Sequence, residues 1–227
     1  MNYKVKDGIP FLDEQLSKLE KRLFNQFSEL LENRGFKYLS IPSIVSIETI
    51  IKQDCIPLSK AIKINEHQYL AGSAEQGILE YFSEQKVKPQ LIYAKNQCFR
   101  GEEEYNDIFR LKEFQKIEQF VFCNKEDWKK YFDYVLENSV EFLKYYNLYY
   151  RIIDTTKKDA GYHKLKYDIE VFTKKFGWIE THSCTYFGKE QTKRFNITGA
   201  THSISNTGIA SPRILIPFIE KYGENIT

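Results

Sequence analysis

Two long apolar runs joined by one short polar segment constrain the fold more than any other feature of the sequence. The runs cover Gln90–Phe99 and Arg110–Cys123, and the segment between them begins Gly101-Glu-Glu-Glu-Tyr-Asn-Asp. A connection this short joins antiparallel strands, because parallel strands need a crossover of about a dozen residues or more. The pair is therefore predicted to form a long antiparallel hairpin.

Three stretches carry the pattern of helices. Residues 11–34 place leucine and phenylalanine at three- and four-residue intervals, with lysine and glutamate on the opposite side. Asn124 is predicted to cap a second helix over about residues 125–146. A last helical stretch follows Gly208, and Pro217 inside it should kink or shorten it.

A short strand over residues 36–41 and a second hairpin complete the expected fold. In that hairpin, Tyr167–Thr173 and Trp178–Thr185 flank a turn that ends in Gly177. The expected fold class is α+β, an antiparallel β-sheet flanked by helices. No linker or repeat divides the chain, so residues 1–227 are expected to form a single domain. Neither GxGxxG nor GxxxxGK[ST] occurs, which disfavours a Rossmann or P-loop sheet.

The composition narrows the class of protein. There are 33 basic and 31 acidic residues, a formal charge of +2, which lacks the basic excess usual for nucleic-acid binders. No apolar run approaches the roughly 18 residues that a membrane span needs. The four cysteines are spread singly, as is typical of reduced thiols. A globular protein of the cytoplasm with no membrane contact is expected.

Charged and aromatic side chains alternate along the first hairpin. Arg100 and Glu102 are predicted to point one way on the first strand, and Arg110, Phe114 and Glu118 to share a face on the second. A stacking ring beside forked guanidinium donors suits an adenine nucleotide. The alternative is a solvated face of cross-strand ion pairs.

Two later segments carry further candidate ligands. Glu180 and Ser183 offer the hard oxygen donors that suit Mg²⁺ carried by a nucleotide. In Ser205–Arg213 the small residues allow a close backbone approach, and Arg213 at a helix start could reach a phosphate. Taken singly, the first pattern is equally typical of the wet side of a sheet, and the second of a loop that leads into a helix.

Read in order, these segments resemble the catalytic domain of class II aminoacyl-tRNA synthetases, most closely the seryl-tRNA synthetases. Gly35–Pro42 resembles motif 1, the dimer-forming element of that family. The other resembling segments are the amino-acid loop Ser73–Glu75, the motif 2 strands Cys98–Glu102 and Arg110–Phe120, the strand Lys166–Phe172, the segment Glu180–Cys184, and the motif 3 segment His202–Arg213.

The resemblance implies that ATP activates an amino acid, expected to be serine, to an aminoacyl-adenylate with release of pyrophosphate. It implies ATP and Mg²⁺ as cofactors, with Mg²⁺ held by Glu180 and Ser183. It implies a catalytic role for Arg100 and Arg213. It also implies that these two residues bind ATP together with Glu102, Arg110, Phe114, Glu180 and Ser183. The residues that it implies for the amino acid are Ser73, Glu75, Arg100, Glu118, Ser205 and Thr207.

Departures from the family pattern shape the expected partners. Neither the N-terminal coiled-coil arm that grips tRNA in that family nor a C-terminal extension is expected, and the motif 2 loop is short and carries Glu103, Glu104 and Asp107. A non-tRNA acyl acceptor, such as a carrier protein or a biosynthetic intermediate, is therefore expected. The alternatives are a minimal core that charges tRNA and a non-catalytic binding or regulatory relative.

Two further expectations rest on the same resemblance. Motif 1 implies a homodimer, with Phe24, Phe27 and Leu31 either partly at its interface or packed in the core of the chain itself. No zinc is expected, because Thr207 stands where the zinc-dependent relatives have a metal-binding side chain near motif 3. The cysteines and histidines also lack the close spacing of structural zinc ligands.

Overall fold

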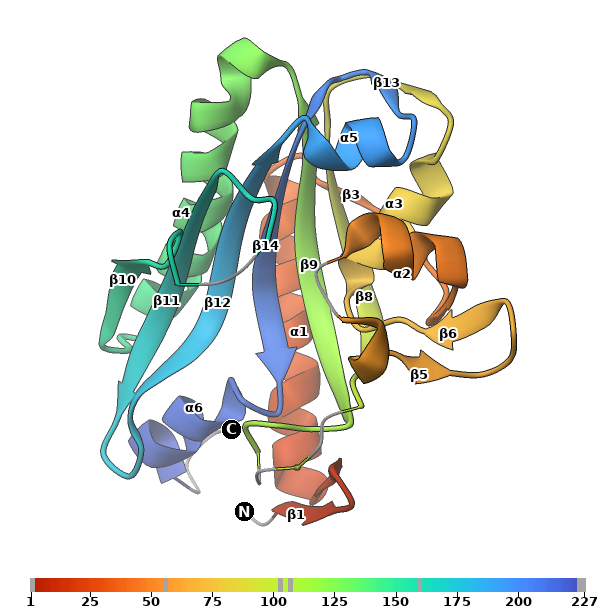
Figure 1. Ribbon diagram of the computed structural model, residues 1–227. Coiled ribbons are helices and arrows are strands. Elements are labelled where there is room, and N and C mark those ends of the chain that lie inside the picture. Colours follow the sequence, from red (N-terminus) through yellow and green to blue (C-terminus); the bar gives the residue numbers. More distant parts are fainter. Residues whose placement is uncertain (1–2, 55–56, 102–103, 106–107, 159–160, 224–227) are drawn as a thin grey trace.

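The centre of the molecule is a seven-stranded sheet in the strand order β10-β11-β12-β14-β9-β8-β3 (Figure 1). A computed structural model describes residues 3–54, 57–101, 104–105, 108–158 and 161–223. The strands of this sheet are β3 (Lys37–Tyr38), β8 (Gln90–Phe99), β9 (Glu113–Cys123), β10 (Tyr150–Asp154), β11 (Leu165–Thr173), β12 (Gly177–Gly188) and β14 (His202–Ser211). Neighbouring strands are antiparallel, except that β3 runs parallel to β8.

Helices and three small sheets surround this centre. The helices are α1 (Glu14–Asn33), α2 (Ile47–Gln53), α3 (Ala74–Phe82), α4 (Trp128–Tyr145), α5 (Glu190–Arg194) and α6 (Leu215–Tyr222), with 3₁₀ turns η1 (Leu58–Lys60) and η2 (Lys125–Asp127). The small sheets pair β1 (Tyr3–Lys6) with β2 (Ile9–Leu12), β4 (Ile44–Ser46) and β5 (Ile62–Lys63) with β6 (Gln68–Leu70), and β7 (Lys86–Val87) with β13 (Thr198–Gly199). The expected α+β class, an antiparallel sheet flanked by helices, is confirmed.

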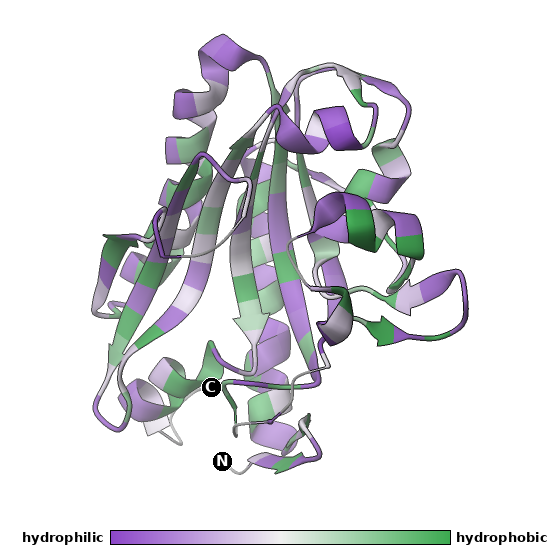
Figure 2. Cartoon of the chain, in the orientation of Figure 1, coloured by the Kyte–Doolittle hydropathy of each residue, from purple (hydrophilic) through white to green (hydrophobic). Residues whose placement is uncertain are grey.

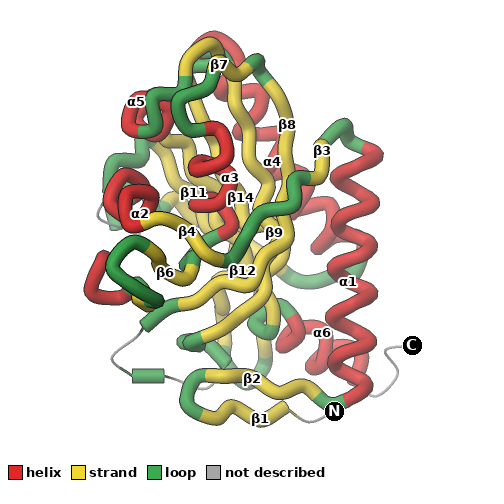
Figure 3. The backbone as a smooth tube through the Cα atoms, turned by 90° about the vertical axis from the view of Figure 1, so that its right-hand side faces the viewer, coloured by secondary structure: helices red, strands yellow, loops and turns green. Residues whose placement is uncertain are grey.

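The pleat of β9 separates the two faces of the large sheet. Ile117 and Val121 belong to the core that α1 and α4 form on one face, whereas Phe120 and Phe122 pack with residues of α3 on the other. Alternate residues of a strand point to opposite faces, so one strand serves both cores. The helices α1 and α3 accordingly lie on opposite sides of the sheet (Figure 3).

Hydrophobic stretches follow the strands, whereas α5 and the upper end of α4 are hydrophilic (Figure 2).

Helix α1 buries the apolar face that the sequence predicts. The Asp13 side chain caps it by accepting a hydrogen bond of 2.9 Å from the backbone N–H of Leu16. Phe24, Phe27 and Leu31 are buried within this chain. Core packing, the alternative considered for these three residues, is therefore correct, and they offer no surface to a second copy. The homodimer stays a prediction.

Strand β14 is the main element that the sequence did not predict. Its residues were expected to form a loop that leads into a helix after Gly208, yet the strand lies between β12 and β9 and pairs with both. Small polar residues carry a weak strand pattern by themselves. Here helix α4 adds stabilisation to that of the neighbouring strands. The side-chain amide of Asn206 donates to the Val135 carbonyl of α4 at 2.6 Å and to Ser139 Oγ of the same helix at 3.0 Å.

Three local expectations are corrected. Asn124 precedes the turn η2 without a side-chain capping bond, and α4 begins at Trp128. Strand β9 begins at Glu113, so Arg110 precedes the strand. Pro217 neither kinks nor shortens α6, because it lies in the first turn, where a backbone N–H has no partner within the helix.

The described cysteines are thiols packed in the core. Cys98, Cys123 and Cys184 are free and buried, whereas Cys55 lies outside the described residues. Burial raises the pKa of Cys98 to about 11, so this thiol stays protonated near neutral pH. Within the described part of the chain, no helix has the length and apolar character to cross a membrane. The cytoplasmic location stays a prediction.

Replacing Gly208 with alanine is expected to lower the free energy of unfolding by about 1–3 kcal/mol, because it overpacks the core. A Cβ atom at this position would lie 2.3 Å from Cε1 of the buried Phe27 ring. Urea denaturation measures the change. In a Phe27→Leu background the same substitution should cost less, since the shorter side chain leaves room; equal costs in the two backgrounds would contradict this account.

Candidate functional site

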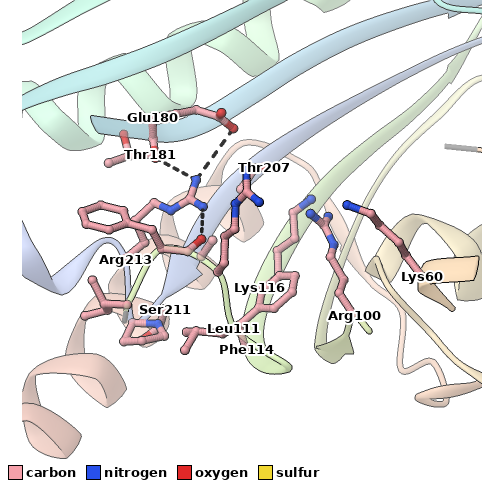
Figure 4. Close-up of a pocket in the computed structure, with 15 residues that line it drawn as sticks. Lys60, Arg100, Leu111, Phe114, Lys116, Glu180, Thr181, Thr207, Ser211 and Arg213 are labelled. Carbon is pink, nitrogen blue, oxygen red and sulfur yellow. Dashed lines mark hydrogen bonds and ion pairs between the residues drawn. The ribbon is translucent and has the colours of Figure 1, made fainter. Parts of the chain in front are cut away.

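One cavity of about 280 Å³ opens on the face of the sheet that carries α3. Figure 4 shows the residues that line it. Its walls come from β9, β12, β14, the turn η1, and the segments on either side of the motif 2 loop. Six of the residues singled out in the sequence line it: Arg100, Arg110, Phe114, Glu180, Thr207 and Arg213. Residues that lie far apart in the chain thus meet around one hollow.

Strand register places the aromatic and basic residues on this face. Phe114, Lys116 and Glu118 alternate along β9 and pair with Cys98, Asn96 and Ala94 of β8. Side chains at alternate positions share a face, as the sequence predicts. Along β9, this face leads from Phe114 and Lys116 in the cavity to the buried Glu118.

Arg100 is held at the end of β8 against the ring of Phe114. Its backbone N–H donates to the Lys112 carbonyl at 2.9 Å, and its Nε donates to the Gly72 carbonyl at 3.4 Å. The guanidinium carbon lies 5.2 Å from the centroid of the Phe114 ring, within the range of a cation–π contact. The cationic group and the aromatic plane are therefore positioned together.

A β-bulge in β12 brings Glu180 and Ser183 onto one face. Glu180 pairs with Glu170 and Ser183 pairs with Asp168, so that β12 holds one residue more than β11 between these two pairs. A spacing of three would otherwise put the two side chains on opposite faces. Ser183 lies on the face of the cavity without lining it.

The oxygen atoms on this part of the sheet suit a hard cation. The carboxyl of Glu180, the hydroxyl of Ser183 and the carboxyl of Asp168 share the face. Asp168 Oδ1 is buried and accepts no hydrogen bond from the described residues, while the Lys166 ammonium lies 3.8 Å away. Desolvation, and after it the charge of Asp168, raises the pKa of the Glu180 carboxyl, although 47% of this side chain is exposed. This donor set fits Mg²⁺, whose charge would stabilise the ionised carboxyls.

Arg213 connects β12 to the segment that precedes β9. Its Nη1 donates to the Glu180 carbonyl at 3.1 Å, and its Nη2 donates to the Phe109 carbonyl at 2.8 Å. Nη1 also lies 4.0 Å from the Glu180 carboxylate, as Figure 4 shows. The guanidinium is thereby fixed on the wall of the cavity opposite Lys60 and Arg100.

The charges that line the cavity are strongly unequal. Among the described lining residues five are basic and one, Glu180, is acidic. The basic residues are Lys60, Arg100, Arg110, Lys116 and Arg213. A recess with an excess of cations beside an aromatic ring suits a ligand that joins several negative charges to a planar ring.

Next to this cavity lies a buried cluster of the opposite character. Glu75 and Glu118 are 6% and 1% exposed. Glu118 is ion-paired with Lys116, and its Oε1 accepts a hydrogen bond of 2.7 Å from Ser205 Oγ. Gln53 Nε2 donates to Glu75 Oε1 at 2.8 Å. Desolvation, and then the charge of Glu118, raises the pKa of Glu75. Two buried carboxyls near one ammonium can accept a further small cation.

The remaining amino-acid candidates frame this buried cluster. Ser73 caps the N-terminus of α3, and its Oγ accepts a hydrogen bond of 3.3 Å from the backbone N–H of Glu75. Thr207 of β14 is paired with Glu118 of the neighbouring strand β9. The structure thus gathers Ser73, Glu75, Glu118, Ser205 and Thr207 on the inner side of the cavity.

Among the basic residues of the cavity, Lys60 is not predicted by the sequence, and the structure leaves the prediction for Glu102 untested. Glu102 lies outside the described residues, as do Glu103 and Asp107 of the motif 2 loop. Lys60 lines the cavity, yet no motif contains it. It lies in a short 3₁₀ turn far from Arg100 in the chain, and such a turn has no periodic pattern that would mark it.

Replacing Glu75 with glutamine is expected to stabilise the protein at pH 8 more than at pH 5. The raised pKa of Glu75 means that folding favours the protonated carboxyl, so its contribution to stability is lost as the pH rises through that pKa. Glutamine is neutral throughout and keeps an oxygen for the Gln53 amide. Urea denaturation at the two pH values measures the difference. Glu66→Gln, at an exposed position, is the control, and a pH-independent effect of Glu75→Gln would contradict the argument.

Comparison with known proteins identifies the family. The model of the tRNA synthetase class II core domain (G, H, P, S and T) matches residues 60–217. Serine–tRNA ligase of Deinococcus radiodurans is 32% identical over 218 residues, 86% of this chain and 51% of that protein. The Thermoplasma volcanium enzyme of the same name is 28% identical over 95% of this chain and 54% of its own. The chain thus spans about half the length of these curated relatives.

Solved structures show the same fold. Seryl-tRNA synthetase from Pyrococcus horikoshii complexed with ATP superposes with a TM-score of 0.86 at 22% identity, over 95% of this chain and 54% of that one. Cytoplasmic serine-tRNA ligase from Naegleria fowleri in complex with AMP gives 0.84 at 24% identity, over 95% and 51%. The chain belongs to the class II aminoacyl-tRNA synthetase core family and is close to seryl-tRNA synthetases over most of its length.

Proposed function

We propose that this chain is the catalytic core of a seryl-tRNA synthetase-like ligase, in which ATP activates serine to seryl-adenylate. The observation that carries the proposal is the meeting of Arg100, Phe114 and Arg213 around one cavity, beside the buried carboxyls of Glu75 and Glu118. Curated relatives named serine–tRNA ligase and neighbours solved with ATP and AMP support it.

The cationic side of the site would hold the nucleotide. Adenine would stack on Phe114, with Glu102 near its amino group, and Arg100 would bind the α-phosphate. Arg110 and Arg213 would hold the outer phosphates. Glu180 and Ser183 would hold Mg²⁺, which neutralises phosphate charge when it is bound.

The carboxyl-rich inner side would hold the amino acid. Glu118 would accept the substrate ammonium, a role that suits a carboxylate 1% exposed to solvent. Ser73 and Glu75 would frame the pocket, and the hydroxyls of Ser205 and Thr207 would bound a side chain as small as that of serine. No zinc is proposed for this pocket.

The reaction then needs positioning and charge neutralisation and no protein nucleophile. A carboxylate oxygen of serine attacks the α-phosphorus in line, the bond from that phosphorus to the bridging oxygen breaks, and pyrophosphate leaves with the electron pair. Arg100 would contact both the attacking carboxylate and the α-phosphate, which fixes the geometry and offsets the charge that develops.

We propose tRNA as the acyl acceptor. The expectation of a carrier protein or a small molecule receives no support from the comparisons, whereas the names of the relatives favour the alternative that the core charges tRNA. Two of the acidic loop residues that disfavour tRNA as a partner, Glu103 and Asp107, lie outside the described residues. In this second step a ribose hydroxyl attacks the seryl carbonyl, and AMP leaves.

Wild-type protein is expected to catalyse exchange of labelled pyrophosphate into ATP with serine and with no other amino acid of a full panel. Arg100→Ala should reduce this exchange by at least about a hundredfold, because the residue contacts both reacting groups. Arg151→Ala, at an exposed position on the far edge of the sheet, is the matched control and should keep wild-type activity. Absence of exchange with every amino acid would reject the proposal.

The acceptor is tested by acylation of serine tRNA with labelled serine. We expect acid-precipitable seryl-tRNA, formed slowly, and none with a tRNA of another specificity. Exchange without any acylation of tRNA would contradict the tRNA proposal while leaving amino-acid activation intact.

A further inference from the structure

Lys60 reaches the nucleotide cavity from outside the large sheet. It is the last residue of the turn η1, which lies between α2 and β5 and belongs to none of the segments that resemble the family motifs. Its side chain nevertheless lines the same cavity as Arg100, Phe114 and Arg213. Figure 4 shows its nitrogen end near those of Arg100 and Lys116.

Backbone hydrogen bonds fix the position of Lys60 relative to Arg100. The N–H of Gly101, the residue after Arg100, donates to the Lys60 carbonyl at 2.8 Å. Within the turn, the N–H of Lys60 donates to the Pro57 carbonyl at 2.8 Å. The base of the lysine side chain is therefore held beside that of Arg100 by ordered main chain, which limits the entropy lost when the lysine binds a ligand.

Basic residues lie on two walls of the cavity. Lys116 is ion-paired with the buried Glu118, and Arg213 lies near the Glu180 carboxylate on the opposite wall. The triphosphate of ATP carries its negative charge along three phosphate groups, so basic side chains besides Arg100, Arg110 and Arg213 can contact it. Lys60 adds a positive charge on the wall where Arg100 would hold the α-phosphate.

We propose that Lys60 is a further substrate-binding residue, which contacts the polyphosphate of ATP and the pyrophosphate that leaves. The inference rests on the proposed function and extends it to a residue outside every motif. A compact ammonium with three donors suits the oxygens of a phosphate group that changes position during the reaction. Lys60 would thus act on the phosphate end of the nucleotide and leave adenine and serine binding unaffected.

The test compares wild-type protein with Lys60→Gln and Lys60→Arg by isothermal titration calorimetry, using ATP, inorganic pyrophosphate and adenosine with Mg²⁺ present. Lys60→Gln should weaken binding of ATP and pyrophosphate about tenfold, the effect of losing one charge-assisted hydrogen bond, and leave adenosine binding unchanged. Lys60→Arg should restore most of the affinity. Lys63→Gln, an exposed lysine in the same segment, should behave as wild type.

Kinetics provide the second readout. In pyrophosphate exchange, Lys60→Gln should raise the KM for ATP about tenfold with an unchanged KM for serine. Equal affinities of wild type and Lys60→Gln for ATP, or an equal loss of adenosine binding, would overturn the inference. Wild-type protein that binds ATP in a Lys60-dependent manner but exchanges pyrophosphate with no amino acid would instead reject the proposed function alone.

Discussion

The alternation of side chains along β9 is the constraint on which the rest of the structure depends. Ile117 and Val121 face the helices α1 and α4, whereas Phe114, Lys116 and Glu118 line the site or lie beneath it. A single strand thus anchors the core and presents the chemistry. Because the period of a strand is two, a register shift of one residue would exchange these roles and destroy both the core and the site.

Two bulges adjust this regular frame where the site requires it. The extra residue in β12 keeps Glu180 and Ser183 on one face. The extra residue in β14, Gly208, lets Thr207 and Ala210 both line the cavity. Bulges are common beside active sites because they redirect single side chains without breaking the sheet. The close contact of Gly208 with Phe27 ties the second bulge to the core, so that site geometry and folding stability depend on the same residue.

The site is divided by charge. Its outer part is lined by five basic residues and one acid, and its inner part holds the buried carboxyls of Glu75 and Glu118. Lys116 lies at the boundary, lining the outer part while paired with Glu118. This division suits a reaction that brings a polyanion and an ammonium compound together, because each substrate is attracted to one part and repelled by the other.

The sequence by itself determined the two hairpins, the helices α1 and α4, and six of the residues that line the cavity, because strand and helix periods are local properties and the motif residues lie within them or beside them. Tertiary structure decided the rest. Strand β14 forms only because β12 and β9 supply its hydrogen bonds on both sides, and Glu180 shares a face with Ser183 only through a bulge that no local pattern specifies. Lys60 joins the site through packing of a segment remote in the chain, and burial of Phe24 and Phe27 in the core required the whole fold. Such features arise from contacts between distant residues, which a local pattern does not encode.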